Sequence, residues 1–513
     1  MAASVAWSAP AQGIAASLAK AAEQGDAMAQ NKLGNAYFSG NGVPQDFKLA
    51  IGWYEKAAAQ GLPNAQFNMG LMYDYGRGVQ QDYQQAAAWY RKAADQGFPE
   101  AQYRLAWMYA HGRGVRQDDA LALALYRKAA EQGLAKSQVN LGYLYENGKG
   151  VPKDYQQAFT WYSKAAEQGN ADAQNNLGTF YSNGYGVAKD YAKAIAWYEL
   201  AVAQGDAAAQ NNLGTMYELG KSVHQDYRKA AYLYQKAATQ GDSDGQTNLG
   251  RMYDKGHGVK QDDIQASFWY RKAAEQGDPV AQNDLGTQYF KGKGVPKDLK
   301  QALSWYQKAA DNGDADGQYN LGLMYWDGVA VKRDYQQAIS WYRKAAAQGN
   351  LDAQFNLGHM YEHGEGLQQD FGEAARLYQQ AAEQGDASAQ VNLAIFYQTG
   401  KGVAQDYQQA AAWYRRAIEQ GKASAENDLG VLYFHGDGVP NKSRVAAYAL
   451  YATSAANNPA DPNPKNNLAR VVEQMSQEEI NAARVLARDM AKPGQVLTAL
   501  DAYLARPTVK EQP

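Results

Sequence analysis

The residues with the clearest potential for chemistry form the string His359-x-x-Glu362-His363. A His-x-x-Glu-His string of this kind binds zinc in inverted zincins, and helical spacing would place both histidines on neighbouring faces. A catalytic zinc normally needs three protein ligands, and the only other histidines are at positions 111, 224, 257 and 435. No third ligand is evident. We therefore expect no metal site and keep a zinc-dependent hydrolase only as the third functional hypothesis.

Other catalytic or ligand-binding motifs are incomplete. Residues 312–317 imitate the start of a calcium loop, but Leu323 stands where a bidentate glutamate is needed. The absence of cysteine from the sequence excludes disulfides, thiolate metal sites and cysteine nucleophiles. There is no phosphate-binding loop and no nucleophile elbow. The sequence therefore predicts a protein that is not an enzyme and uses no cofactor.

These motifs belong to a larger pattern with a fixed period. The pair Leu33-Gly34 is followed 36 residues later by Met69-Gly70, and the same place recurs up to residue 429, in twelve copies without insertion or deletion. A period of this length is the signature of a solenoid, in which each unit buries its apolar face only against its neighbours. We therefore predict one elongated all-α solenoid of helix-turn-helix repeats.

The fifth copy, residues 171–206, shows how one repeat should begin. Apolar side chains at positions 173, 177 and 181 predict a first helix that ends at Gly184. Glycine occupies that last position in all twelve copies, as expected for a left-handed C-cap. A second glycine two residues later indicates a turn, and only Ser222 and Ala330 depart from it.

The second helix should begin at a cap and carry an aromatic stripe. Asp190 stands at a position that is Asp in eleven copies, Lys442 being the exception, and we expect it to be the N-cap. In the Asp-Tyr-Gln-Gln copies, which start at 82, 154, 334 and 406, a later glutamine should complete a capping box. Trp occupies the place of Trp197 in eight copies, and we expect this stripe to be core. Gly205 should close the helix.

A glycine also recurs in the middle of the first helix. Gly178 and its nine equivalents each cost about 1 kcal/mol relative to alanine at a helix interior. Such a repeated penalty makes sense only if the missing side chain lets the two helices of a pair approach closely. We therefore expect close packing at this point.

Residues 173–205 follow the pattern Ala-Gln-x-Asn-Leu-Gly-x-x-Tyr-x-x-Gly-x-Gly-Val-x-x-Asp-x-x-x-Ala-x-x-Trp-Tyr-x-x-Ala-Ala-x-x-Gly, with Val202 in the second Ala place. This pattern resembles the Sel-1-like repeat, a relative of the tetratricopeptide repeat, over about residues 18–456. The resemblance implies antiparallel helix pairs in a right-handed superhelix with the first helices on its concave side. It also implies an adaptor or scaffold for proteins, in bacteria often at the envelope or toward a host. One cysteine-rich branch is linked with β-lactam binding, an activity we do not carry over to this cysteine-free chain.

We divide the chain into an N-terminal segment with a capping helix (1–25), the twelve repeats (26–456) and a C-terminal helical cap and tail (457–513). The first ten residues are Ala-rich and no Lys or Arg precedes Lys20, so the charged start of a signal peptide is missing. This composition resembles the tail of a trimmed signal sequence. We expect a periplasmic or secreted protein, with a cytoplasmic location as the alternative.

The C-terminal cap begins where the repeat pattern decays. After Val445, Ala449 takes the place of Trp and Asn457 that of Gly. Further on, residues 476–479 should form a capping box that opens a helix, which Pro493-Gly494 stops before a last short helix.

Charge and hydropathy narrow the partners. Fifty Lys and Arg against 53 Asp and Glu give a formal charge of -3, which offers no broad cationic field for nucleic acid. No window approaches the roughly eighteen uninterrupted apolar residues that span a bilayer. We expect a soluble chain that binds no nucleic acid and has no membrane span.

Three positions of the first helix, equivalent to 175, 179 and 182, lie within about 60° of one another opposite the buried side. They vary freely between copies and should face a groove. Copies five to seven, the polar middle, carry Asn175, Thr179, Ser182, Asn211, Thr215, Glu218, Thr247, Arg251 and Asp254. Copies two to four form an N-terminal patch of Phe67, Leu71, Tyr103, Trp107, Val139 and Tyr143. Copies nine to eleven form a C-terminal patch of Tyr319, Leu323, Trp326, Phe355, His359, Val391 and Ile395.

Apolar patches rimmed by polar residues mark interaction sites, with aromatic residues as the usual anchors. The alternative is that these side chains only fill space between first helices, which pack roughly 10 Å apart. We predict a non-enzymatic scaffold or adaptor that holds a protein or peptide in the groove. The second hypothesis is an envelope component that binds a cell-wall glycan, because stacked aromatics would suit sugar rings equally well.

Overall fold

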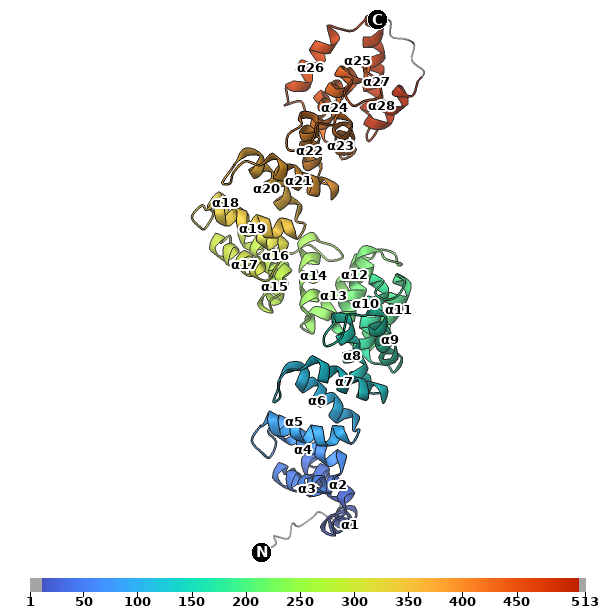
Figure 1. Ribbon diagram of the computed structural model, residues 1–513, viewed down its shortest axis with the longest axis vertical. Helices are drawn as coiled ribbons and strands as arrows, with labels where there is room; N and C mark the ends of the chain where they lie inside the picture. The colour runs from blue at the N-terminus through green and yellow to red at the C-terminus, as the bar shows by residue number, and fades with distance from the viewer. Residues whose placement is uncertain (1–11, 507–513) are drawn as a thin grey trace. The chain divides into compact units, whose positions relative to one another are not determined.

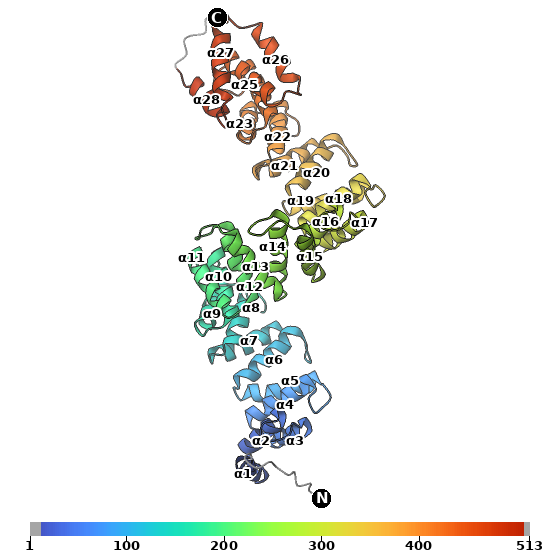
Figure 2. The ribbon, with the colours of Figure 1, turned by 180° about the vertical axis from the view of Figure 1, so that it is seen from behind.

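The computed structural model describes residues 12–506, and the chain divides into two compact units, Met1–Gln261 and Asp262–Pro513. The described residues form 28 helices and no strand (Figures 1 and 2). This confirms the predicted all-α solenoid. Residues 1–11, which carry the composition on which export was predicted, and the polar tail 507–513 lie outside the described residues.

The first unit holds the following helices: α1 (Gln12–Glu23), α2 (Ala27–Ser39), α3 (Phe47–Ala59), α4 (Pro63–Tyr75), α5 (Tyr83–Asp95), α6 (Pro99–His111), α7 (Asp119–Glu131), α8 (Ala135–Asn147), α9 (Tyr155–Glu167), α10 (Ala171–Asn183), α11 (Tyr191–Ala203), α12 (Ala207–Leu219), α13 (Tyr227–Thr239) and α14 (Ser243–Lys255).

The second unit holds the following helices: α15 (Asp263–Glu275), α16 (Pro279–Lys291), α17 (Leu299–Asp311), α18 (Ala315–Asp327), α19 (Tyr335–Ala347), α20 (Leu351–His363), α21 (Phe371–Glu383), α22 (Ala387–Thr399), α23 (Tyr407–Glu419), α24 (Ala423–His435), α25 (Arg444–Asn457), α26 (Asn463–Val472), α27 (Gln477–Met490) and α28 (Val496–Leu504).

From α2 to α25, even-numbered helices are the first helices of the repeats and odd-numbered helices the second. Within each unit a first helix packs on the neighbouring second helices of that unit, as α10 does on α11 of its own repeat and α9 of the repeat before. Successive first helices also touch, as α10 with α12 and α16 with α18, whereas successive second helices make no comparable contact. The first helices are therefore the inner row of each unit.

The glycine turns form as predicted. All twelve first helices end at a glycine in the left-handed region, with φ between 63° and 86°. The second turn glycine also has positive φ, and a Cβ at Gly186 would lie 2.6 Å from the Tyr155 carbonyl oxygen of the preceding second helix. Ser222 and Ala330, the two exceptions, keep the left-handed backbone at φ of 55° and 58°. They are the only described residues other than glycine with positive φ, so the turn geometry overrides their preference.

The Asp caps form, but the predicted capping boxes do not. Eleven second helices start at an Asp whose carboxylate accepts backbone N–H groups, as Asp82 accepts from Gln84 and Gln85. A capping box also requires the cap's own N–H to donate to the later glutamine. The Asp82 N–H instead donates to the Tyr73 carbonyl oxygen at 3.0 Å, and the copies at 154, 334 and 406 do the same. The capping-box prediction is therefore wrong for these copies.

The core of each repeat contains a tyrosine, which in most repeats lies under a mid-helix glycine. A Cβ at Gly178 would lie 2.6 Å from the Tyr198 ring, and the same relation recurs at Gly142 with Tyr162. The twelve tyrosines at this position are at most 4% exposed. The close approach that the helix-interior glycines predicted is therefore confirmed.

The tryptophan stripe is less buried than predicted. Of its eight members, Trp161 and Trp413 are buried at 9% and 8% exposure, and the other six are half-buried. A lysine or arginine one turn later commonly covers the ring, as Lys344 covers Trp341 at 3.7 Å. The prediction that the stripe is core is therefore wrong for most copies, because the neighbouring tyrosine already fills that place.

The last repeat contains one extra residue in its turn. Ser443 rather than Lys442 caps α25, since its hydroxyl accepts the Ala446 N–H. The ring of Tyr451 lies under Gly430, so Leu450 and not Ala449 occupies the tryptophan place. This corrects the sequence alignment after Val445 by one position.

The C-terminal helices pack on the last repeat. Helices α26 and α27 contact α25, and α28 contacts α27. The predicted capping box at Ser476 and Glu479 is confirmed, with both of its hydrogen bonds present. Helix α26 was not predicted; it begins at Asn463-Pro464, in a Pro- and Asn-rich stretch between the last repeat and the capping box.

Candidate binding surface

The hydroxyl group of each buried tyrosine reaches the inner face of the first helices. The Tyr198 hydroxyl lies 3.2 Å from Thr179 Oγ1, and the Tyr234 hydroxyl donates to Glu218 Oε2 at 2.6 Å. Burial raises the pKa of Tyr198, and burial followed by Glu218 raises that of Tyr234, so both hydroxyls stay protonated donors. The side chains at positions equivalent to 179 and 182 therefore lie around the tyrosine hydroxyl, which is a fixed polar group.

In the polar middle, asparagine side chains hydrogen-bond one first helix to the next, and we call this row of bonds the asparagine ladder. Asn212 Nδ2 donates to Asn175 Oδ1 at 2.9 Å, and Asn248 Nδ2 donates to Asn211 Oδ1 at 2.8 Å. Asn211 and Thr247 are only 7% and 3% exposed. These polar side chains therefore hold first helices together, although the sequence suggested that they simply meet water.

In the N-terminal patch, apolar side chains, most of them aromatic, take the place of asparagines in this ladder. Phe67 packs against the buried Tyr90 at 5.6 Å between ring centroids and against Phe98 at 5.3 Å. Trp107 stacks on His111 at 4.3 Å. All six residues of the patch are half-buried except Tyr143, which is 44% exposed. These side chains are therefore partly packed against neighbouring repeats and partly exposed to solvent.

The same repeats also lack side-chain caps on their first helices. In eight of the twelve repeats an Asp or Asn caps the first helix, as Asn170 Oδ1 accepts from the Ala173 N–H at 2.9 Å. In α4, α6 and α8 the cap residues are Leu62, Phe98 and Leu134, which make no such hydrogen bond. Sequence reasoning missed these three residues. The loss of Asp or Asn from the cap position was the signal that could have found them.

The C-terminal patch is similar in shape but more enclosed. Tyr319 and Phe355 each lie 5.7 Å from the buried tyrosine of their repeat, Tyr342 and Tyr378. Val391 is buried at 8% exposure, and the other six residues of the patch are half-buried.

The histidine and glutamate string lies beside this patch on α20. His359 and His363 stack at 4.1 Å, and His363 Nδ1 lies 2.9 Å from the His359 carbonyl oxygen. Glu362 Oε2 accepts from the Tyr378 hydroxyl at 2.8 Å, as equivalent acids do in other repeats. Across residues 12–506, no group of three or more His, Cys, Asp or Glu side chains could hold a metal ion.

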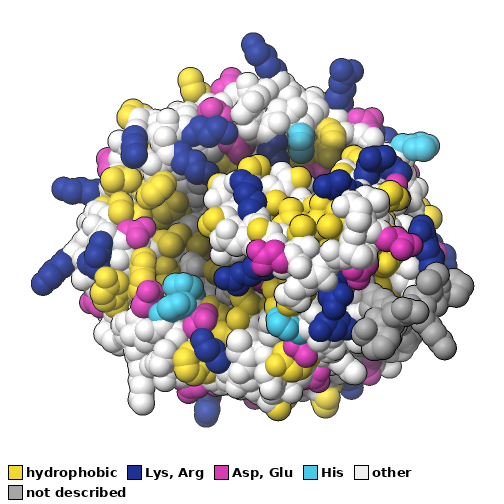
Figure 3. Space-filling view, turned by 90° about the horizontal axis from the view of Figure 1, so that it is seen from above, with side chains coloured by type: hydrophobic (Ala, Val, Ile, Leu, Met, Phe, Trp, Pro, Cys, Tyr) yellow, Lys and Arg dark blue, Asp and Glu magenta, His cyan; other side chains and the backbone are white. Residues whose placement is uncertain are grey.

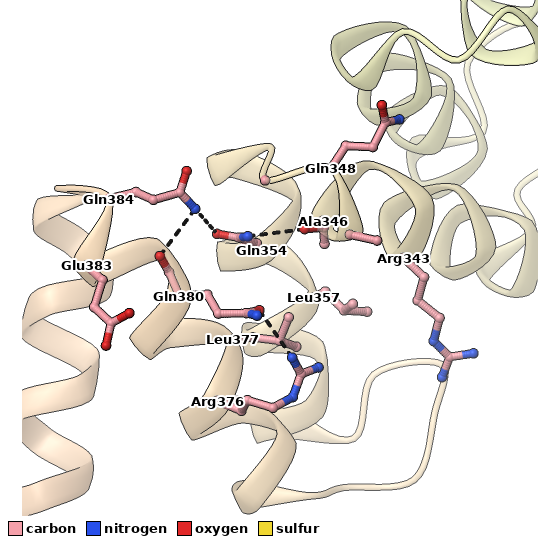
Figure 4. A pocket seen from close by; sticks show the side chains of 12 residues that line it. Arg343, Ala346, Gln348, Gln354, Leu357, Arg376, Leu377, Gln380, Glu383 and Gln384 are labelled. Carbon is pink, nitrogen blue, oxygen red and sulfur yellow. Dashed lines mark hydrogen bonds between the residues drawn. The ribbon is translucent and has the colours of Figure 1, made fainter. Parts of the chain in front are cut away.

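One cavity lies away from the inner face. It measures about 610 Å³ between α19, α20 and α21, and Arg343, Gln354, Arg376 and Gln384 are among its lining residues (Figure 4). Gln384 Nε2 donates to Gln354 Oε1 at 2.9 Å, and Arg376 is paired with Glu373 at 2.8 Å. The Gln384–Gln354 bond recurs in most repeats and Arg376 is already paired, so the cavity lacks the free polar groups that define a ligand site.

Charged side chains are mixed over the visible surface. Seen from above, Lys and Arg alternate with Asp and Glu, with hydrophobic side chains between them (Figure 3). None of the described helices is long and apolar enough to cross a membrane.

The architecture is that of a helical repeat solenoid. The Sel1 repeat model matches the chain in twelve consecutive segments, which run without a gap from residues 27–62 to residues 423–459. The protein therefore belongs to the Sel1 repeat family, whose solenoids are typically non-enzymatic scaffolds for protein–protein interaction.

Two solved structures are similar to this chain. A protective antigen of uropathogenic Escherichia coli with an SLR fold is 36% identical, with 97% of this chain and 99% of that chain covered and a TM-score of 0.60. A Sel1 repeat protein from Oxalobacter formigenes is 35% identical, with 60% of this chain and 90% of that chain covered and a TM-score of 0.46. A search of curated proteins found no match.

Proposed function

We propose that this protein is a scaffold that binds protein or peptide partners through the N-terminal patch and the C-terminal patch. The observation that carries the proposal is the coincidence of two losses in repeats two to four. Their first helices lack the Asp or Asn cap, and Phe67, Tyr103 and Val139 stand where the asparagine acceptor of the ladder would be, so no ladder bond joins these repeats to the repeat that follows. Repeat two keeps its bond to repeat one, from Asn68 Nδ2 to Asn31 Oδ1 at 2.9 Å. A missing cap costs about 1 kcal/mol, so three neighbouring repeats forgo roughly 3 kcal/mol of local stability.

Half-buried aromatic side chains stand in place of those hydrogen bonds. Trp107 and Phe67 are held on one side by neighbouring rings and remain open on the other. Rigid aromatic anchors of this kind supply most of the affinity in many protein interfaces. Patch residues in repeats nine to eleven offer the same arrangement around Tyr319 and Phe355.

A displayed library of random peptides tests the proposal. We expect sequences selected on the full chain to lose binding to a Trp107→Ala, Trp326→Ala double variant, with the helical content unchanged by circular dichroism. Selection of no peptide, or equal binding to the double variant, would contradict the proposal. A glycan array screened in parallel tests the cell-wall alternative, and a glycan signal that the same variant abolishes would replace the peptide assignment.

A location outside the cytoplasm, either periplasmic or secreted, fits this role. The E. coli relative is described as a protective antigen, and an antigen that protects must be accessible to the host. Fractionation of cells that express the native gene tests the location, and recovery only with cytoplasmic markers would contradict it.

A further inference from the structure

Cationic side chains lie around the N-terminal patch, two of them against its aromatic residues and two over Tyr75, an aromatic ring that is not one of the patch residues. The Arg113 guanidinium lies 5.6 Å from the Trp107 ring centroid, and Lys149 Nζ lies 3.2 Å from the Tyr143 hydroxyl. Arg77 and Arg104 both lie over the Tyr75 ring, at 5.8 Å and 5.9 Å. Tyr75, on α4, is 52% exposed. Four cations from three consecutive repeats therefore border one apolar surface.

Among the described residues these cations have no acid at ion-pair distance, although Asp74 interacts electrostatically with Arg104 and Arg113. In the part of the chain that the structure describes, none of the four forms an ion pair. The acids in the same first helices are Asp74, Glu100 and Glu146. Two of them are occupied, because Asp74 Oδ2 accepts from the Tyr90 hydroxyl at 3.1 Å and Glu146 Oε2 accepts from the Tyr162 hydroxyl at 2.7 Å.

Acidic side chains lie beside the C-terminal patch. Burial, followed by the charges of Asp386 and Asp316, raises the pKa of Asp352, and these three acids lie on or cap three successive first helices. Burial raises the pKa of Tyr319, and Asp352 is the largest charge contribution to that shift. The one histidine of this patch, His359, lies 3.7 Å from Glu365. Two surfaces with the same apolar design therefore carry different signs.

We propose that the N-terminal patch binds an acidic segment of a partner polypeptide, in which apolar side chains alternate with carboxylates. This inference rests on the proposed function, and it names the chemistry of the partner at one of the two patches. Arginine donates paired hydrogen bonds to carboxylates and stacks on aromatic rings at the same time. Trp107, Phe67 and Leu71 take the apolar side chains, while Arg77, Arg104, Arg113 and Lys149 bind the carboxylates.

Matched peptides test the proposal on the full chain carrying Trp326→Ala, so that only the N-terminal patch is intact. The peptides share Leu and Phe anchors and differ only in carrying Glu, Gln or Lys at the other positions. At low ionic strength we expect the Glu peptide to bind about tenfold more tightly than the Gln peptide, a difference of about 1.4 kcal/mol. This difference should shrink at high salt, because exposed charges are screened.

Charge-removing variants locate the effect. Arg77→Gln with Lys149→Gln changes two exposed side chains and should lower the affinity for the Glu peptide several-fold, with the Gln peptide within about twofold of its original affinity. Arg104→Gln with Arg113→Gln should act in the same way. The control is Lys92→Gln with Lys164→Gln, which removes two cations that cover Trp89 and Trp161 on second helices and should leave both affinities unchanged.

The outcomes separate this inference from the proposed function. Equal binding of the Glu, Gln and Lys peptides would overturn the acidic preference and leave a general peptide scaffold. Binding of a single-stranded oligonucleotide at least as tight as that of the Glu peptide, and sensitive to the same arginines, would assign the patch to nucleic acid instead. Failure of every peptide to bind, with the fold intact by circular dichroism, would overturn the proposed function as well.

Discussion

The N-terminal patch and the polar middle share one backbone design but use their inner faces differently. Both have the glycine turns, the Asp-capped second helices and a buried tyrosine under the first helix. In the polar middle, asparagines such as Asn175 and Asn211 bond one first helix to the next, and Asp or Asn caps each of these helices. In the N-terminal patch, apolar side chains replace both kinds of bond.

This difference separates the residues that build the solenoid from those that are free to vary. The polar middle shows that the inner face can satisfy its own hydrogen bonds without a partner. Repeats two to four give up the caps and the ladder bond to the repeat that follows, while keeping the shared core, so their sequence cannot be explained by folding alone. The four predictions below test this comparison.

The largest effect is expected in the shared core. Tyr90→Ala in the N-terminal patch repeats and Tyr198→Ala in the polar middle each remove a fully buried ring, and each should destabilise the protein by about 3–5 kcal/mol. Chemical denaturation followed by circular dichroism measures both. A cost several kcal/mol smaller in one region would show that the two regions do not share a core.

The last repeat differs from the others at a buried position, the one whose glutamine bonds to a neighbouring repeat elsewhere in the chain. Its exposed face is not altered by this difference. In the other eleven repeats a glutamine stands at this buried position, whereas Glu426 here is 1% exposed and accepts from Asn457 Nδ2 at 3.0 Å. Burial raises the pKa of Glu426 from 4.5 to about 7. The unfolded chain ionises first, so stability falls as pH rises from about 4.5 to about 7 and stays low above that.

Glu426→Gln should remove this dependence. We expect the variant to be about 3 kcal/mol more stable than the wild type at pH 8 and nearly equal to it at pH 4, measured by urea unfolding. Asp428, whose pKa burial raises to about 6, titrates in both proteins, so the difference between them isolates Glu426. An equal gain at both pH values would contradict the buried ionisation.

The cap positions give a reciprocal exchange. Leu134→Asp restores a cap to α8 in the N-terminal patch and should stabilise the protein by about 1 kcal/mol. Asn170→Ala removes the cap of α10 and should destabilise it by about the same amount. Thermal unfolding of the two variants checks the signs. Loss of stability in Leu134→Asp would show that leucine there is a packing residue.

The ladder itself gives the smallest difference. Asn212→Ala breaks a bond between repeats and should cost about 1 kcal/mol. Asn140→Ala, at the same position in the N-terminal patch, should cost less, because the Asn140 amide donates only to the Lys136 carbonyl oxygen of its own helix. The denaturant midpoints of the two variants give their stability costs. Equal costs would show that the ladder bond does not stabilise the contact between repeats.

Much of the fold could be predicted because it depends on short-range spacing. The turn at Gly184, the cap at Asp190 and the close approach at Gly178 all follow from residues within one repeat. The extra residue in the last turn was missed because Lys442 still fits the spacing, although Ser443 supplies the cap.

The binding surface was harder to predict because its bonds join different repeats. Asn212 contacts Asn175 across 37 positions, and Phe98, which packs on Phe67, is the N-cap of the next repeat's first helix. The helical periodicity predicted which positions of each first helix lie opposite its buried side. It did not predict which of the polar side chains there pair with a neighbouring repeat. The capping boxes failed for a different reason, because the Asp82 N–H is already bonded to the Tyr73 carbonyl oxygen, at the end of the first helix of the same repeat.

The most direct test of the central claim compares two tryptophans in neighbouring repeats. Trp107 is half-buried on the inner face, whereas Trp161 is buried on a second helix at 9% exposure. For a peptide selected on the wild type, the account predicts that Trp107→Ala weakens binding at least tenfold, with stability lowered by no more than about 1 kcal/mol. Trp161→Ala should lower stability by about 3 kcal/mol and leave the affinity of the folded protein unchanged. Unchanged peptide affinity in Trp107→Ala, with a stability loss as large as that of Trp161→Ala, would contradict it.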